Sequence, residues 1–162
     1  MGRGFFNIKY SSMGSGMLDV AINSGKQVAK ELKIMAELAV QEHSNVIIDK
    51  NVDNLWEGKN SKGVSLASIG GEYSPKTVEY KKLKGDPYDR VTLHDTRDFV
   101  EDFFVKPVKS GWELNSKDSK RNQLVEDWGE DIFGNTEEDE KEVNQEYIIP
   151  EVIEFTLDNL KM

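Results

Sequence analysis

Residues 17–43 constrain the fold most, because their apolar side chains recur with the period of an amphipathic helix. At about 1.5 Å per residue, this helix would be on the order of 40 Å long, which exceeds the usual length in globular domains. Gly25 weakens it locally by about 1 kcal/mol relative to alanine. The apolar positions predict a stripe that faces the core: Leu18, Ala21, Ile22, Val28, Ala29, Leu32, Met35, Ala36, Ala39 and Val40.

The length and composition bound the class of protein. A chain of 162 residues has the size of one domain with its own core. Cysteine is absent, which excludes disulfide bonds, thiolate metal sites and cysteine nucleophiles, and fits assembly in a reducing cytoplasm. No apolar run reaches the length of about eighteen residues that a membrane span needs. We therefore expect no membrane association.

Charge is distributed unevenly along the chain. The net charge is −9, but residues 1–121 carry +2, whereas residues 122–162 hold 2 basic and 13 acidic residues, a net −11. This asymmetry indicates either a solvated acidic helix and loop or an interaction face that repels polyanions. The second interpretation assigns the acidic surface to Glu137, Glu138, Asp139, Glu140 and Glu142.

The start of the first helix suggests that the chain is divided into an N-terminal arm and one domain. Residues 1–16 contain four glycines and predict a flexible N-terminal arm, while residues 17–162 predict a single α+β domain. Phe5, Phe6 and other apolar residues make this arm unusual for a disordered tail. We expect the arm to dock on a neighbouring subunit.

Shorter elements occupy the middle of the chain. Residues 46–48 extend the helix or form a short strand, and the apolar pairs on either side of residues 58–63 predict a hairpin or an extended loop. Pro75 suits the first turn of a helix that runs to Leu83 and ends at Gly85. Residues 103–109 and 111–116 predict an antiparallel hairpin around a tight turn.

Residues 91–105, VTLHDTRDFVEDFFV, join two apolar runs through a short capped turn. Thr96 can act as the N-cap by accepting a backbone N–H, and Asp98 adds a favourable negative charge in the first turn. Leu93 and Phe99 supply apolar anchors on either side. Because no nucleophile, histidine pair or glycine cradle accompanies this motif, it favours a role in assembly over a role in chemistry.

The C-terminal part of the chain predicts two helical segments. Residues 116–128 carry an apolar stripe, with Ser116 as the cap and Gly129 as the end. Residues 136–139 resemble a capping box that opens a helix to Leu160, kinked or restarted at Pro150. The expected inner face of this helix comprises Val143, Tyr147, Ile149, Ile153, Leu157 and Leu160. The whole pattern predicts an α+β fold, in which a long N-terminal helix and C-terminal helices pack on a small antiparallel sheet.

Residues that could carry chemistry are sparse. His43 and His94 lie in different elements, neither has a second histidine at helical spacing, and the alternation of residues 91–95 places His94 at the surface. The carboxylates in residues 86–102 lack the spacing of a calcium loop, and the glycines match neither a Walker loop nor a dinucleotide-binding turn. We therefore expect no enzyme activity, no cofactor and no metal site.

The order and spacing of several short motifs cover nearly the whole chain. Taken together, they resemble the small tail-completion, or head–tail joining, proteins of tailed bacteriophages, including the virion morphogenesis proteins. The motifs are residues 17–43, residues 80–85, the turn of Leu93, Asp95, Thr96, Arg97, Asp98 and Phe99, residues 103–116, the pair Trp128 and Gly129, and the pair Ile149 and Pro150.

The resemblance implies a structural virion protein rather than an enzyme. Copies would form a ring of about six or twelve subunits at the head–tail junction, or neck, where the tail joins the connector and DNA passes through. The portal or connector and the tail tube proteins would be its partners, and an acidic lumen would repel DNA phosphates. The protein would be assembled in the host cytoplasm and located in the virion.

The candidates for the structural motif or the subunit interface come from two sources. Phe5 and Phe6 come from the apolar arm, and the motifs that carry the resemblance add Leu93, Asp95, Thr96, Phe99, Trp128 and Pro150. Two alternatives stay open. An acidic phage-encoded protein that mimics DNA and inhibits restriction would also carry a carboxylate-rich surface. A small hydrolase that uses carboxylates or a metal ion is the other, because carboxylate pairs meet only in three dimensions.

Overall fold

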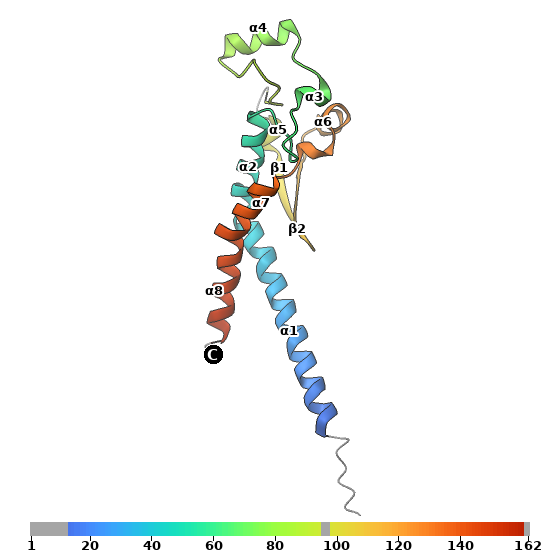
Figure 1. Cartoon of the computed structure of the whole chain (residues 1–162), viewed down its shortest axis with the longest axis vertical. Helices are drawn as coiled ribbons and strands as arrows, with labels where there is room; N and C mark the ends of the chain where they lie inside the picture. The colour runs from blue at the N-terminus through green and yellow to red at the C-terminus, as the bar shows by residue number, and fades with distance from the viewer. Residues whose placement is uncertain (1–12, 95–97, 161–162) are drawn as a thin grey trace, which may run out of the picture.

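The computed structural model describes residues 13–94 and 98–160. Figure 1 shows an elongated molecule in which the long helix α1 extends away from a body that holds the sheet and the shorter helices. The elements are α1 Met13–Glu42, α2 Ser44–Trp56, α3 Ala67–Gly70, α4 Pro75–Lys84, α5 Asp98–Glu101, β1 Phe103–Val108, β2 Gly111–Ser116, α6 Arg121–Trp128, the 3₁₀ turn η1 Glu130–Ile132, α7 Glu137–Val143, the π-helical turn η2 Asn144–Ile148 and α8 Ile149–Leu160. The predicted α+β class is confirmed.

Helices α1 and α2 follow each other with only His43 between them. Helix α1 begins at Met13, so residues 13–16 of the predicted arm belong to the helix, while residues 1–12 lie outside the described part of the chain. Helical hydrogen bonding continues across the junction, because the Ile47 N–H donates to the His43 carbonyl at 3.2 Å. Residues 46–48 therefore extend the helical rod and do not form a strand.

His43 connects the junction between α1 and α2 to the C-terminal helix through side-chain contacts. Its Nε2 lies 2.7 Å from Oε1 of Glu151 in α8, and its ring lies 5.1 Å from the ring of Tyr147. The histidine is half-buried between the two helices. It therefore has a structural role at the contact of α1, α2 and α8.

The predicted hairpin is confirmed as an antiparallel pair of strands, with Phe103 opposite Ser116 and Val108 opposite Gly111. Pro107 lies opposite Trp112. Both strands of a two-stranded sheet are edges, so the missing N–H of proline is tolerated. The sheet packs through β1 against α1 and α2, while α8 packs against α1.

Residues 57–66 form a compact loop rather than a hairpin with a strand at Leu55. Leu55 and Trp56 complete α2, so a strand at this position is wrong, and the extended loop is the better description. Asn60 organises the loop, because its Oδ1 accepts the backbone N–H groups of Lys62 at 3.0 Å and Val64 at 2.9 Å. An isolated bridge between Lys59 and Ser65 is the remaining strand-like feature of this loop.

Two predicted helix termini are confirmed in detail. Ser74 caps α4 by accepting the Thr77 N–H, and Gly85 ends it in the left-handed conformation at φ 74°. Thr136 and Asp139 form the predicted capping box of α7, since each side chain accepts the backbone N–H of the other. These local signals depend only on neighbouring residues, which is why the sequence predicts them well.

The predicted cap of α6 is wrong. Ser116 ends β2, where its hydroxyl donates to the Phe99 carbonyl at 3.1 Å and accepts the Asp118 N–H at 3.1 Å. Helix α6 begins only at Arg121 and ends at Gly129, which has φ 82°. Ser116 therefore joins the hairpin to the segment that precedes it, and residues 117–120 form a turn.

The C-terminal helix turns a different face inward from the one predicted. Val143 and Ile148 are buried, but Ile149, Ile153 and Leu157 are 47%, 52% and 52% exposed. The π-helical turn η2 explains the difference, because a turn with more residues than an α-turn shifts the phase of every later side chain. The π-turn ends at Ile148, two residues before Pro150, whose missing N–H cannot continue regular helical bonding. The helix is thus continuous to Leu160, with its irregularity placed ahead of the proline.

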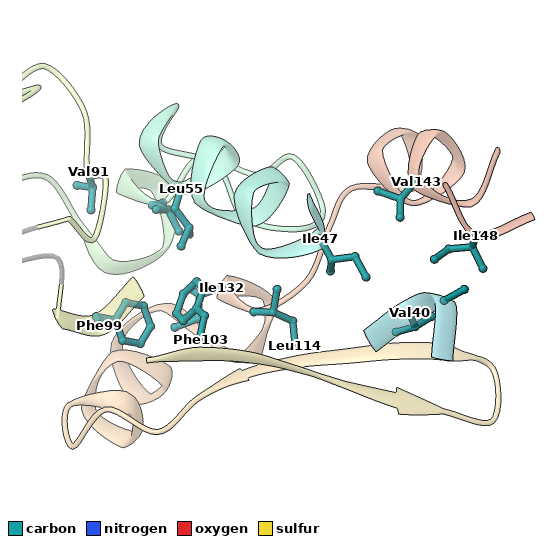
Figure 2. Close-up of a cluster of buried hydrophobic side chains, with 12 residues drawn as sticks. Val40, Ile47, Leu55, Val91, Phe99, Phe103, Leu114, Ile132, Val143 and Ile148 are labelled. Carbon is teal, nitrogen blue, oxygen red and sulfur yellow. The ribbon is translucent and has the colours of Figure 1, made fainter. Parts of the chain in front are cut away.

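The core lies between the hairpin and α2 and continues toward α1 and α7 (Figure 2). Phe99, Phe103 and Phe133 form an aromatic cluster at one end, with ring centroids 4.9 to 5.8 Å apart. The buried apolar residues are Ala39, Val40, Ile47, Leu55, Leu66, Val91, Phe99, Phe103, Leu114, Ile132, Val143 and Ile148. Among the described residues, no helix is long and apolar enough to cross a bilayer.

Candidate functional site: a lysine-lined cavity and an uncovered helix face

A cavity of about 530 Å³ lies beside α4, the segment that precedes α5, and α6. Three residues predicted for the structural motif, Leu93, Phe99 and Trp128, come together in its wall. The other residues that line it are Tyr73, Lys76, Thr77, Tyr80, Lys81, His94, Lys120, Gln123, Leu124 and Asp127. The sequence motif at residues 91–105 and the Trp128 motif thus contribute to one site.

Leu93 adopts the left-handed conformation, with φ 52°. A residue with a Cβ atom pays roughly 1–2 kcal/mol for this conformation. The turn is supported by Thr92, whose N–H donates to the Tyr73 hydroxyl at 3.0 Å and whose Oγ1 accepts the His94 N–H at 3.4 Å. The turn is therefore held against Tyr73, which lines the same cavity.

Lys81 is a buried cation in the cavity wall, only 3% exposed. Its Nζ donates to the His94 carbonyl at 2.9 Å and lies 5.0 Å from the centre of the Tyr73 ring. The ring of His94 is half-buried and meets Trp56 edge-on at 4.8 Å, so the predicted surface position of His94 is wrong. The last turn of α4 carries Lys81, Lys82 and Lys84, and Lys81 is the buried member while the other two are exposed.

The remaining predicted motif residues do not join this site. Phe5, Phe6, Asp95 and Thr96 lie outside the described residues. Pro150 is exposed in the first turn of α8 and does not line the cavity.

The predicted acidic surface is tied in part to α2. Glu137 and Glu138 are exposed, but Asp139 and Glu142 both pair with Lys50, at 3.7 Å and 2.7 Å. The hydrogen bond with Glu142 raises the pKa of Lys50 despite its partial desolvation, and the neighbouring carboxylates add to the rise. The acidic segment therefore presents fewer uncompensated charges than its composition indicates.

The pKa values of two carboxyl groups in α7 are shifted in opposite directions. Burial alone would raise the pKa of Asp139, but hydrogen bonds from Asn54 and Thr136 and the charge of Lys50 outweigh it, and the pKa is lowered. Loss of hydration raises the pKa of Glu140, and the charge of Glu137 adds to this effect. Asp139 therefore serves the helix terminus and is not available as a solvated surface charge.

An apolar face of α1 is the second candidate site. Every described side chain in residues 22–31 is exposed, including Ile22, Val28 and Ala29. Sequence reasoning assigned this stripe to the core, because a periodic apolar pattern looks the same whether it faces its own chain or another one. The length of the helix was the available signal, since its 30 residues far exceed the mean of about 11–12 residues for an α-helix.

Within residues 13–94 and 98–160, no group of three or more histidine, cysteine, aspartate or glutamate side chains could hold a metal ion. The described residues therefore form two candidate sites, the cavity beside α4 and the uncovered face of α1.

Comparisons of the chain with protein-family models, with curated proteins and with solved structures find no match.

Proposed function

We propose that this protein is a structural subunit of a tailed bacteriophage, which assembles with copies of itself into a ring at the head–tail junction. The ring joins the tail to the connector, lets DNA pass, and performs no catalysis. The observation that carries the proposal is the uncovered apolar face of α1, which needs a partner. The motifs that resemble those of head–tail joining proteins are the reason for assigning this assembly to the head–tail junction.

The uncovered face continues a face that the protein itself buries. In the C-terminal half of α1, Ala39 and Val40 are buried in the core and Leu32, Met35 and Ala36 are half-buried. At helical spacing the same face continues to Ile22, Val28 and Ala29, beyond the contact with α8. An isolated helical segment of this length is marginal in water, so a covering partner would stabilise it.

Helix α8 presents a matching stripe. Ile149, Ile153 and Leu157 are spaced four residues apart and are exposed on one side of the helix. This stripe faces away from the side of α8 that carries the half-buried Val152 and Phe155. Each copy therefore has two different apolar helix surfaces available for contact.

The charges beside the two stripes favour contact between unlike surfaces. Residues 20–33 of α1 contain Lys26, Lys30 and Lys33 against the single carboxylate of Glu31. Helix α8 carries three acidic residues and no lysine or arginine, although Glu151 already pairs with His43 of the same chain. A contact of α1 with α1 would place lysines against lysines, whereas α1 of one copy on α8 of the next pairs opposite charges. Such a head-to-tail contact generates a ring when its rotation closes.

The acidic helix α7 would face the channel of this ring. Glu137 and Glu138 are exposed and belong to the first turn of α7, so they can contribute a negative potential that repels DNA phosphates. This part of the proposal fails if a reconstruction of the ring places residues 137–146 on its outer surface. Connector and tail tube proteins would contact the two open ends of the ring.

The alternatives gain less support from the geometry. A DNA mimic needs rows of unpaired carboxylates, but Lys50 pairs with two of the acidic residues of α7. A hydrolase needs carboxylates that converge on a cleft, and among the described residues Asp127 is the one carboxylate in the wall of the cavity beside α4.

The proposal is tested by the mass of the particle in solution. Native mass spectrometry of the full chain should report a closed oligomer, and the double substitution of Ile153→Glu with Leu157→Glu should dissociate it. Leu83→Glu is the matched control, because Leu83 is 88% exposed on α4, away from both stripes. If the α8 substitutions and the control leave the same oligomer intact, the proposed interface is wrong.

A charge reversal tests the pairing of unlike surfaces. Lys26→Glu with Lys30→Glu should weaken the oligomer, and Glu154→Lys with Asp158→Lys should do the same. The combination of all four substitutions should restore it, because the attraction is re-formed with the signs exchanged. Failure of the combined variant to recover the oligomer would exclude this contact.

A further inference from the structure

The cavity is lined by residues of α4 and α6. These two helices lie at the end of the molecule opposite the free end of α1 (Figure 1). The cavity is therefore separate from the helix faces that would contact neighbouring copies. Its volume of about 530 Å³ falls in the range of pockets that hold small ligands.

The wall of the cavity is mainly apolar and aromatic. Tyr73, Tyr80, Leu93, Phe99, Leu124 and Trp128 supply this surface. Phe99 is buried, and Leu93, Leu124 and Trp128 are half-buried, so the apolar part belongs to the packed body of the domain. A ligand that fits here carries an apolar or aromatic portion.

Positive charge converges on the same cavity. Lys81 lies in the wall, and the exposed residues Lys76 and Lys120 line the opening from α4 and from the turn before α6. Asp127 is the opposing carboxylate among the lining residues, and it is exposed. The cavity therefore combines an apolar wall with an excess of cations, although the whole chain is acidic.

Lys81 has hydrogen-bonding capacity left over. An ammonium group has three N–H donors, and the His94 carbonyl accepts one of them at 2.9 Å. The Tyr73 ring provides a cation–π contact, but no described carboxylate lies within ion-pair distance of Lys81. A buried cation with no counter-ion in the described part of the chain is costly, and an anion that enters the cavity would offset this cost.

We propose that this cavity binds a carboxylate group carried on an apolar or aromatic body, with Lys81 as its counter-ion. One negative charge matches the one buried cation, and the aromatic wall covers the rest of the ligand. Lys76 and Lys120 attract the anion to the opening. A nucleic-acid backbone fits less well, because it requires a row of exposed cations rather than one buried lysine in an apolar wall.

The proposal is tested by titrating the full-length protein with phenylacetate and with its uncharged analogue phenylacetamide. NMR detects binding through the indole N–H signal of Trp128 and the backbone amides of Leu93 and Leu124. Phenylacetate should give saturable shifts, and phenylacetamide should bind about tenfold more weakly, as expected for the loss of a charge-assisted hydrogen bond. Equal binding of the two compounds, or no binding of either, would overturn the proposal.

Two lysine substitutions test whether Lys81 binds a ligand or only stabilises the turn at His94. Lys81→Met removes the charge but keeps most of the stem, and should abolish the preference for the carboxylate. Lys82→Met is the matched control, because Lys82 is the exposed neighbour that contacts Tyr88 instead. If Lys81→Met keeps the preference, Lys81 only holds the His94 carbonyl and the proposal is wrong.

A variant at the opening keeps the test decisive if Lys81→Met does not fold. Lys76→Glu with Lys120→Glu changes only exposed residues, and it should weaken phenylacetate binding several-fold while leaving phenylacetamide binding unaffected.

A short capped peptide with adjacent phenylalanine and glutamate distinguishes the source of the carboxylate. Tighter binding of the peptide than of phenylacetate identifies a protein partner, and the reverse identifies a small molecule. Equal shifts with inorganic phosphate alone would contradict the role of the apolar wall.

Discussion

Gly70 should be unable to accept a methyl group, because the indole of Trp128 occupies the space beside it. An added Cβ would lie 2.3 Å from Nε1 of Trp128 and 2.5 Å from Cε2, well inside the ordinary contact distance of about 3.5–4.0 Å. The indole is a rigid ring that packs against the core. Gly70→Ala therefore has to displace Trp128 or the end of α3.

The size of the effect follows from two opposing contributions. Overpacking of a filled site costs typically about 1–3 kcal/mol. Alanine in a helical position regains up to about 1 kcal/mol relative to glycine. We expect a net loss of about 1–2 kcal/mol, which lowers the melting temperature by roughly 2–8 °C for a chain of this length.

Urea denaturation monitored by circular dichroism measures this loss, with Gly25→Ala as the matched control. Gly25 lies in α1, and nothing approaches its added Cβ within 4 Å, so alanine there should stabilise the helix by about 0.5–1 kcal/mol. The indole N–H signal of Trp128 should also shift in Gly70→Ala. If Gly70→Ala is as stable as Gly25→Ala and the indole signal stays in place, the described contact between α3 and α6 is wrong.

Two further substitutions test the interactions that hold the C-terminal segment on α2. Asp139→Asn should destabilise the protein by about 1 kcal/mol at neutral pH. Because the pKa of Asp139 is lowered on folding, its contribution is fully present above the unfolded value of about 3.9 and is lost as the pH falls from there through the lower pKa of the folded state. The difference from the parent should thus close in urea titrations at acidic pH, and a constant difference would refute the assignment. Asn51→Leu should cost about 2–4 kcal/mol, since the carbonyls of Ile132 and Gly134 lose their donor at 3.1 and 2.6 Å. Asn122→Leu at the surface is its control in thermal denaturation, and equal melting temperatures would contradict the role of Asn51.

Local signals made much of the fold predictable. The caps at Ser74 and Thr136, the left-handed Gly85 and the hairpin of residues 103–116 depend on side chains that lie within a few positions of each other. Because a local pattern does not contain tertiary contacts, the predicted inner face of the C-terminal helix was wrong beyond Ile148. A single π-turn changes the phase of all later residues, and η2 packs against α1, a contact that the local pattern does not contain.

The candidate sites were less predictable than the fold. Leu93, Phe99 and Trp128 were identified as a motif, but their convergence with Lys81 depends on the tertiary arrangement of α4, α5 and α6. Lys81 belongs to a cluster of lysines that has the sequence pattern of a solvated helix end, and only its 3% exposure distinguishes it. The face of α1 was recognised as apolar, but periodicity alone cannot identify the chain that covers it.

Chemical cross-linking between copies tests the proposed head-to-tail contact most directly. The chain has no cysteine, so Val28→Cys in α1 and Ile153→Cys in α8 introduce unique thiols at positions that are 51% and 52% exposed. A short bismaleimide added to the double variant should produce a ladder of covalent oligomers that ends at one closed ring, while each single variant should give no species larger than a dimer. A double variant that also stops at the dimer, or that remains monomeric, would contradict a ring built from α1 of one copy and α8 of the next.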